Sequence, residues 1–234
     1  AQVHDLQFKA AGGSIFRLIV GDLPPSSIAY PATLTSAETS VRTLSRNAVS
    51  DAVSIRRTDG NAAIQSGSTI LPLPALRTLN GVVVAEPMEG TFPETAIDAT
   101  FTASPFPPLF VSGRIAAPGE KDNILLTVTP GQSLHFQLAA RGISSPLRGH
   151  LAVFNGDTLV AQNDGNSGAD DPAISLTVPE AVTQLKVLVR DINEKGSQAS
   201  AYQLQIARAD RPAFTMSTGE ESIQLPLNGS VPVR

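Results

Sequence analysis

The chain has 234 residues, enough for one large or two ordinary domains, and only 16% of them are charged. Its formal net charge of -4 argues against a nucleic-acid partner, because phosphate binding needs a basic surface that displaces counterions. The absence of cysteine excludes disulfides and thiolate metal sites, and no apolar run reaches the roughly 20 residues that would insert into a membrane. The 18 glycines and 18 prolines favour turns and short strands, which predicts an all-β fold.

The two ends of the chain share a pattern at one constant spacing. Val3, Asp5, Phe16, Leu18 and Val20 correspond in order to Val189, Asp191, Tyr202, Leu204 and Ile206. Each copy consists of a strand, a polar loop and an alternating strand. We therefore predict that residues 1–23 are the terminal hairpin of a preceding copy, and that the chain is a fragment of a tandem array.

Residues 24–108 show a weaker pattern. Candidate strands lie at 41–44, 52–56, 62–65, 82–85 and 96–101. A proline-rich stretch at 104–108 reads as a linker, because consecutive prolines stiffen the chain and cannot donate ladder hydrogen bonds. We predict a small β-sandwich spacer of immunoglobulin-like type.

Residues 109–209 show the clearest pattern, in which short apolar segments alternate with turn residues. These segments lie at 110–116, 123–128, 133–138, 149–154, 158–162, 173–178, 183–189 and 201–207. Asn155-Gly156 is typical of a tight hairpin turn, since both residues tolerate a positive φ angle. Strands at this spacing predict an antiparallel β-sandwich or jelly roll, and residues 210–234 are expected to begin a following β domain.

Several segments of this module carry a family resemblance. They are Val111-Ser-Gly-Arg-Ile, Pro118-Gly-Glu-Lys-Asp, Val128-Thr-Pro-Gly-Gln, Ser145-Pro-Leu, Leu159-Val-Ala-Gln-Asn-Asp, Asp170-Asp171 and Tyr202-Gln-Leu-Gln-Ile. The module resembles the bacterial pre-peptidase C-terminal domain family, β-sandwich modules appended to secreted peptidases and large exported proteins. The resemblance implies a non-catalytic, secreted, periplasmic or cell-surface module, and some members bind calcium. Arg148 departs from the family pattern, in which an acidic residue is common at this place.

An acidic loop is the main candidate for a calcium site. Its oxygen ligands would come from Asp164, Asn166, Asp170 and Asp171. Calcium prefers six to eight oxygen ligands on a turn-rich loop, and Gly165 and Gly168 allow the chain to take the tight path this needs. The alternative is a solvated hairpin loop in which Asn and Asp side chains cap their own turns. Asp122 is a weaker candidate, because at a strand start it is expected to bond turn amides.

Other kinds of site find less support in the sequence. Gly165-Asn-Ser-Gly is similar to the nucleophile turn of serine proteases, but a triad also needs a histidine and a carboxylate. Only His4, His135 and His150 are available, and we expect no enzyme activity. The absence of tryptophan and the presence of two tyrosines leave little for a sugar-stacking platform.

These observations predict a structural spacer that presents loops as an adhesion surface, with calcium as its potential cofactor. Its expected partners are other modules of the same protein and an extracellular protein or polysaccharide. The alternative is an accessory domain for targeting or secretion of a peptidase or other hydrolase encoded elsewhere in the parent chain. Flanking sequence would separate the two, since a peptidase domain upstream favours the accessory role.

Overall fold

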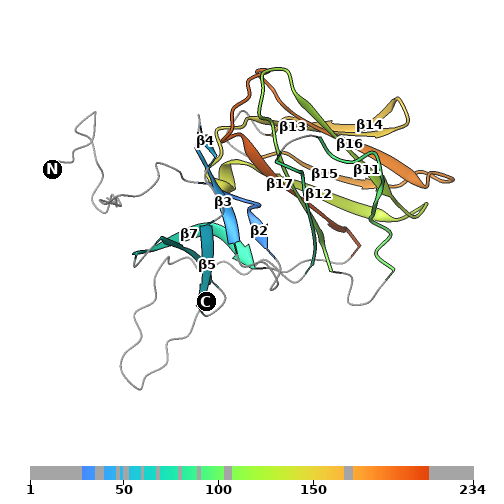
Figure 1. The fold of residues 1–234 in the computed structure, drawn as a ribbon. Helices are drawn as coiled ribbons and strands as arrows, with labels where there is room; N and C mark the ends of the chain where they lie inside the picture. Colours follow the sequence, from blue (N-terminus) through green and yellow to red (C-terminus); the bar gives the residue numbers. More distant parts are fainter. Residues whose placement is uncertain are drawn as a thin grey trace, which may run out of the picture.

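The computed structural model describes residues 28–34, 40–45, 48–49, 53–58, 61–66, 69–78, 81–88, 91–102, 107–165 and 171–210. In this part of the chain the regular elements are β-strands and one short 3-10 helix, so the predicted all-β class is confirmed. Figure 1 shows an N-terminal sheet, drawn blue to cyan, beside a two-layered sandwich drawn green to orange. The predicted N-terminal hairpin and the predicted domain start after Asp210 lie outside the described residues.

Seven strands make up the N-terminal sheet. They are β1 (Ile28–Tyr30), β2 (Thr33–Leu34), β3 (Ser40–Ser45), β4 (Ala48–Val49), β5 (Val53–Thr58), β6 (Asn61–Ser66) and β7 (Thr69–Thr78). Their order is β1-β3-β5-β6-β7-β2, and β4 pairs with β3 beside this path. The first and last strands of the order are therefore neighbours in the chain, with β1 antiparallel to β3 and β2 parallel to β7.

Two five-stranded sheets form the sandwich. The first, called the β10 sheet, has the order β15-β12-β17-β10-β8, with bounds Ala173–Thr177, Ser133–Ala139, Ala201–Arg208, Leu109–Arg114 and Val82–Ala85. The second, called the β11 sheet, has the order β14-β13-β16-β11-β9, with bounds Thr158–Asn163, Gly149–Asn155, Gln184–Asp191, Lys121–Thr127 and Ile97–Asp98. A 3-10 helix, η1 (Arg141–Ile143), follows β12.

The core of the sandwich follows from simple alternation along its strands. In β11 and β12 every second residue is buried, as expected for strands with one face toward a core. Phe136 of the β10 sheet and Val187 of the β11 sheet belong to the same buried cluster. Strands β10 to β17 match the eight segments predicted between residues 110 and 207, including the hairpin at Asn155-Gly156.

The sandwich also includes strands that the sequence places in the spacer. β8 runs parallel to β10, with Val82 opposite Leu109, and β9 runs parallel to β11, with Ile97 opposite Leu126. Segment 81–102 therefore supplies an edge strand to each of the two sheets.

A second buried cluster joins the N-terminal sheet to the sandwich. Ile28, Tyr30 and Leu44 pack with Ile143 and Ala201. The Tyr30 hydroxyl donates to the backbone carbonyl oxygens of Glu86, at 2.9 Å, and of Ser112, at 3.1 Å. The junction thus combines apolar packing with buried hydrogen bonds to the backbone beside β8 and in β10.

Candidate functional site

The structure does not bring the described acids of the predicted calcium loop together. Asp164 is hydrogen-bonded to His150, and its side chain is 61% exposed. Asn163 accepts a hydrogen bond from the Gly165 amide at 2.6 Å, which is the side-chain turn expected of a solvated loop. Asn166 and Asp170 lie outside the described residues.

Asp171 has a structural role at the start of η1. Its two carboxylate oxygens accept hydrogen bonds from the backbone amides of Ala140, at 2.8 Å, of Arg141, at 3.2 Å, and of Gly142, at 3.3 Å. These bonds hold the turn that follows β12. Neither Asp164 nor Asp171 belongs to a group of three metal-ligating side chains in the described part of the chain.

Asp122 lies elsewhere and is more unusual. It points to the inner side of β11 and is 2% exposed. Its Oδ2 accepts a hydrogen bond from the Tyr202 hydroxyl at 2.7 Å, whereas its buried Oδ1 has no partner. The prediction that Asp122 bonds turn amides is therefore wrong, because the side chain turns into the core. A buried carboxylate oxygen without a donor is costly, which makes this position the first candidate for a ligand.

Two further carboxylates approach Asp122. Glu86, just after β8, and Glu120, just before β11, join it in a group whose ligand atoms lie within 4.8 Å of one another. One oxygen of each added residue is already engaged. Glu86 accepts from the Arg114 amide at 2.9 Å, and Glu120 accepts from the Ala117 amide at 2.7 Å. We call Glu86, Glu120 and Asp122 the carboxylate cluster.

Neighbouring residues fix the geometry of the carboxylate cluster. Gly113 of β10 leaves the space in which the Tyr202 hydroxyl and ring lie, since a Cβ there would overlap both. The Arg114 guanidinium donates to the Met88 carbonyl at 2.8 Å and to the Gln198 side chain at 2.6 Å. Arg114 therefore holds the segment after β8 in place and puts one positive charge near the three acids.

Burial changes the acidity of these groups. Loss of solvation, reinforced by the charge of Asp122, raises the pKa of Glu86 to about 8. Loss of solvation also raises the pKa of Asp122 to about 7, although the hydrogen bond from Tyr202 opposes the change. Burial therefore brings the pKa values of both carboxyl groups into the neutral range, where a nearby positive charge favours their ionised forms.

The carboxylate cluster could supply part of the ligand set of a hard divalent cation, one oxygen from each residue. Calcium takes oxygen ligands in flexible geometry, and three carboxylates with one unpaired buried oxygen offer such a donor set. A doubly charged ion would also offset the burial of two acids more completely than Arg114 alone.

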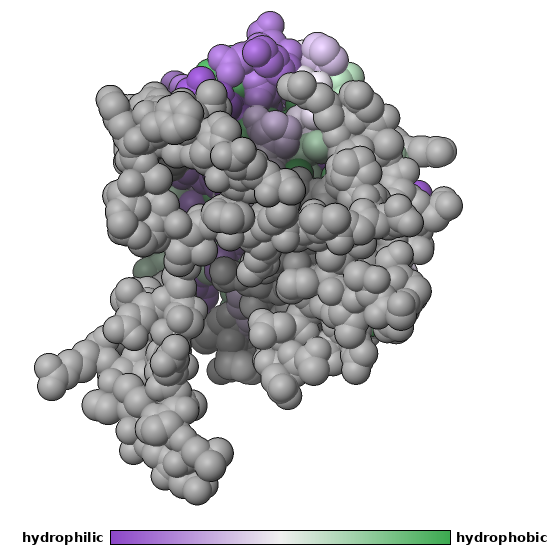
Figure 2. Space-filling model, turned by 90° about the vertical axis from the view of Figure 1, so that its left-hand side faces the viewer, coloured by the Kyte–Doolittle hydropathy of each residue, from purple (hydrophilic) through white to green (hydrophobic). Residues whose placement is uncertain are grey.

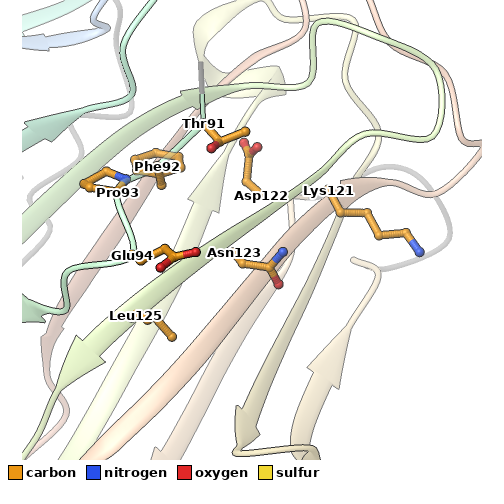
Figure 3. Close-up of a pocket in the computed structure, with 8 residues that line it drawn as sticks. All are labelled: Thr91, Phe92, Pro93, Glu94, Lys121, Asp122, Asn123 and Leu125. Atoms are coloured by element: carbon orange, nitrogen blue, oxygen red, sulfur yellow. The ribbon is translucent and has the colours of Figure 1, made fainter.

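A cavity of about 250 Å³ gives access to this region (Figure 3). Its lining residues are Thr91, Phe92, Pro93, Glu94, Lys121, Asp122, Asn123 and Leu125. Figure 3 shows the Glu94 side chain pointing toward Asn123, whereas the Asn123 amide and the Lys121 side chain extend away from Glu94. Asp122 is the member of the carboxylate cluster that contributes to this lining.

Glu86 and Glu120 were not identified from the sequence as site residues. Glu120 and Asp122 stand two residues apart at a strand start, so alternation alone would place both on one side. Glu86 carries no such signal, because its position depends on the pairing of β8 with β10.

The two described histidines lie in different sheets. His135 is on the outer side of β12, where its Nδ1 lies 2.8 Å from the Ser175 Oγ. His150 is on β13, in the β11 sheet, beside Asp164. His135 and Ser175 form an exposed cross-strand pair. Among the described residues no carboxylate is hydrogen-bonded to His135, which a serine-protease triad would require.

Comparisons with known proteins give a limited result. No family model and no curated protein sequence matches the chain. Among solved structures, a periplasmic inhibitor of g-type lysozyme from Aeromonas hydrophila is 14% identical, with a TM-score of 0.34, over 55% of this chain and 98% of that protein. The pre-peptidase C-terminal domain of collagenase from Bacillus anthracis is 9% identical, with a TM-score of 0.33, over 50% of this chain and 99% of that domain.

These likenesses concern small β-domains and decide neither the family nor the function of the chain. In the described residues, no helix is long and apolar enough to cross a membrane.

Proposed function

We propose that the sandwich is a non-catalytic module of a larger exported protein, serving as a structural spacer and a ligand-presenting adhesion surface. A calcium ion at the carboxylate cluster stabilises it. The observation that carries this proposal is the buried Asp122 Oδ1, which lacks a donor and lies beside the carboxylates of Glu86 and Glu120.

The position of the carboxylate cluster supports a structural role. Glu86 follows an edge strand of the β10 sheet, whereas Glu120 and Asp122 belong to the start of β11 in the other sheet. An ion between them would join the two layers. It would also act on the junction with the N-terminal sheet, because Tyr30 donates to the Glu86 carbonyl. Burial of two acids without bound metal opposes folding, so the ion adds stability that the protein alone lacks.

Calcium-dependent unfolding tests this proposal. Thermal melts with millimolar calcium and with excess EDTA should differ, because a ligand that binds only the folded state stabilises it. At calcium about 100-fold above its Kd the gain is about 2.7 kcal/mol, a shift of a few degrees for a chain of this size.

Variants locate the site. Glu86→Gln and Asp122→Asn should abolish the calcium shift, whereas Asp164→Asn, in the loop favoured by the sequence, should keep it. Absence of a shift in the unaltered chain would refute the cation site. A shift lost in Asp164→Asn and kept in Asp122→Asn would instead place the ion in the loop.

A further inference from the structure

The outer side of the β11 sheet has an uneven distribution of charge. Side chains alternate between core and exterior, so the outward positions of β11, β13 and β16 follow from their pairing register. These positions are occupied by Lys121, Asn123, Leu125, Thr127, His150, Ala152, Phe154, Gln184, Lys186, Leu188 and Arg190. None of them is an aspartate or glutamate, although the whole chain has a net charge of -4; the acid on this side is Asp98 of the edge strand β9, opposite Thr127.

One end of this side is basic. Lys121 lies opposite Arg190, and Arg190 lies opposite His150, which is itself buried, in a single row across three strands. Arg148 is exposed and precedes His150 by two residues, so the alternation of side chains along the strand places it on the same side of the sheet. Like charges directly opposite each other destabilise a sheet. Lys121, Arg148 and Arg190 form no ion pair with the carboxylates of the described residues.

The other end is apolar. Leu125, Phe154 and Leu188 are each only partly buried on this side, and Leu159, opposite Phe154 on β14, is 44% exposed. The Lys186 ammonium lies 5.3 Å from the centre of the Phe154 ring. The basic row and the Leu125 row are four residues apart along β11, which corresponds to about 13 Å. We call this combination the basic–apolar face.

Carboxylates at the margin of the basic–apolar face are engaged elsewhere or only loosely paired. Asp164 bonds His150, and Asp157 lies 3.7 Å from Lys186 with a fully exposed side chain. Exposed pairs of this kind contribute little stability. Glu94 points toward Asn123 in the cavity of Figure 3, from which Lys121 extends away.

The outer side of the β10 sheet is different. On β12 and β15 its outward residues are polar and include no carboxylate, lysine or arginine: His135, Gln137, Ser175 and Thr177. Strand β10 contacts the N-terminal sheet through the hydrogen bond from the Tyr30 hydroxyl to the Ser112 carbonyl. Figure 2 shows hydrophilic residues gathered at the top of the molecule, the end at which the loop before β11 lies in Figure 1. The Gln203 side chain of β17 donates to the Thr33 hydroxyl, so the N-terminal sheet contacts the outer side of the β10 sheet, whereas the basic–apolar face belongs to the other sheet of the sandwich.

We propose that the basic–apolar face binds a protein segment that offers acidic side chains to Lys121, Arg148 and Arg190 and apolar side chains to Leu125, Phe154 and Leu159. This inference rests on the proposed ligand-presenting role. Charge complementarity identifies the acidic part, because uncompensated cations that oppose each other across strands gain most from an anionic partner. The half-buried leucines favour a protein over a polysaccharide, since sugars prefer open aromatic platforms and peptides bury aliphatic side chains.

Direct binding tests the proposal on the whole chain in the presence of calcium. The probe is a fluorescent peptide of about ten residues, with a Glu-rich half and a Leu/Phe half. Its binding is measured as a rise in fluorescence anisotropy. We expect a Kd below about 1 mM that weakens with added salt. Arg148→Glu with Arg190→Glu should weaken binding at least tenfold, or about 1.4 kcal/mol.

Matched variants control for net charge and for folding. Arg141→Glu with Arg208→Glu makes the same change in charge away from this face and should leave binding unchanged. Leu159→Ser, at an exposed hairpin position, should weaken binding without loss of stability. This variant tests the face independently if the double variant Arg148→Glu with Arg190→Glu fails to fold.

Three results would overturn the proposal. They are no binding of the acidic peptide, equal binding of a peptide with Lys in place of Glu, and binding of heparin with none of the peptide. The calcium-dependent melt remains a separate measurement, so failure here is distinguishable from failure of the cation site.

Discussion

Asp122 shows how one side chain can be held in a costly state by its surroundings. The strand alternation that buries Ile124 and Leu126 also buries Asp122, and Tyr202 supplies a donor to only one of its oxygens. Glu86 adds a second buried acid nearby. The raised pKa values of both groups mean that folding without a metal favours their protonated forms.

This leads to a prediction for stability against pH. In the folded chain the pKa values are about 8 for Glu86 and about 7 for Asp122, against ordinary values of 4.5 and 3.8. At these two groups the folded state then binds more protons than the unfolded state, so their contribution to stability is full below about pH 4 and falls as pH rises toward 8. Urea unfolding in EDTA should show this loss, of a few kcal/mol.

Glu86→Gln and Asp122→Asn should each flatten the pH profile, and saturating calcium should flatten it as well by replacing the protons. A profile in EDTA that rises between pH 5 and 8 would contradict the assignment of these two groups.

Gly113 carries a second residue-scale prediction. A methyl group at this position would overlap the Tyr202 ring and hydroxyl, which lie 0% exposed in the core. Gly113→Ala should therefore destabilise the chain by about 1–3 kcal/mol through overpacking and should weaken the calcium shift. Gly142→Ala is the matched control, because its nearest neighbour is the Ala139 Cβ at 3.9 Å. Equal denaturation midpoints for the two variants would show that Gly113 is not needed for close approach.

At the scale of elements, what could be predicted depends on the range of the interactions. Strands β10 to β17 follow from local alternation and from turns such as Asn155-Gly156, so the sequence identified all eight. The parallel pairings of β8 and β9 involve partners far along the chain, and no local pattern predicts them. The carboxylate cluster was missed for the same reason, because Glu86 reaches Asp122 only through the pairing of β8.

Tyr30 provides the element-scale prediction. Its hydroxyl donates to two carbonyls, one beside β8 and one in β10, and so connects the N-terminal sheet to two strands of the sandwich. Tyr30→Phe should cost about 1–3 kcal/mol, because both buried carbonyls lose a donor. Hydrogen exchange by mass spectrometry should show faster exchange in residues 82–88 than in β13. Unchanged exchange throughout residues 82–88 would argue against this connection.

At the scale of the whole molecule, two buried clusters meet at the sandwich. Leu44 from the N-terminal sheet is 0% exposed and packs with Ile143 and Ala201 of the sandwich. Because this packing is continuous with elements of the sandwich, the two parts are expected to unfold together.

Leu44→Ala should remove about 2–5 kcal/mol and separate the calorimetric transition into two, because the cavity lies at the junction. Leu151→Ala, an equal truncation inside the sandwich core, should lower the melting temperature and keep one transition. Two transitions in the unaltered chain would show that the junction does not couple the parts.

The order of strands in the β10 sheet has a mechanical consequence. Val82 at the start of β8 and Ile206 near the end of β17 both lie opposite Leu109, so they occupy one row of the sheet. The chain thus enters and leaves this sheet at the same end, about two strand spacings or 10 Å apart. Tension along the chain would peel β8 from β10 one residue pair at a time. Lys121, Arg148 and Arg190 lie toward the opposite end of the strands, the end at which Ala201 packs against the N-terminal sheet.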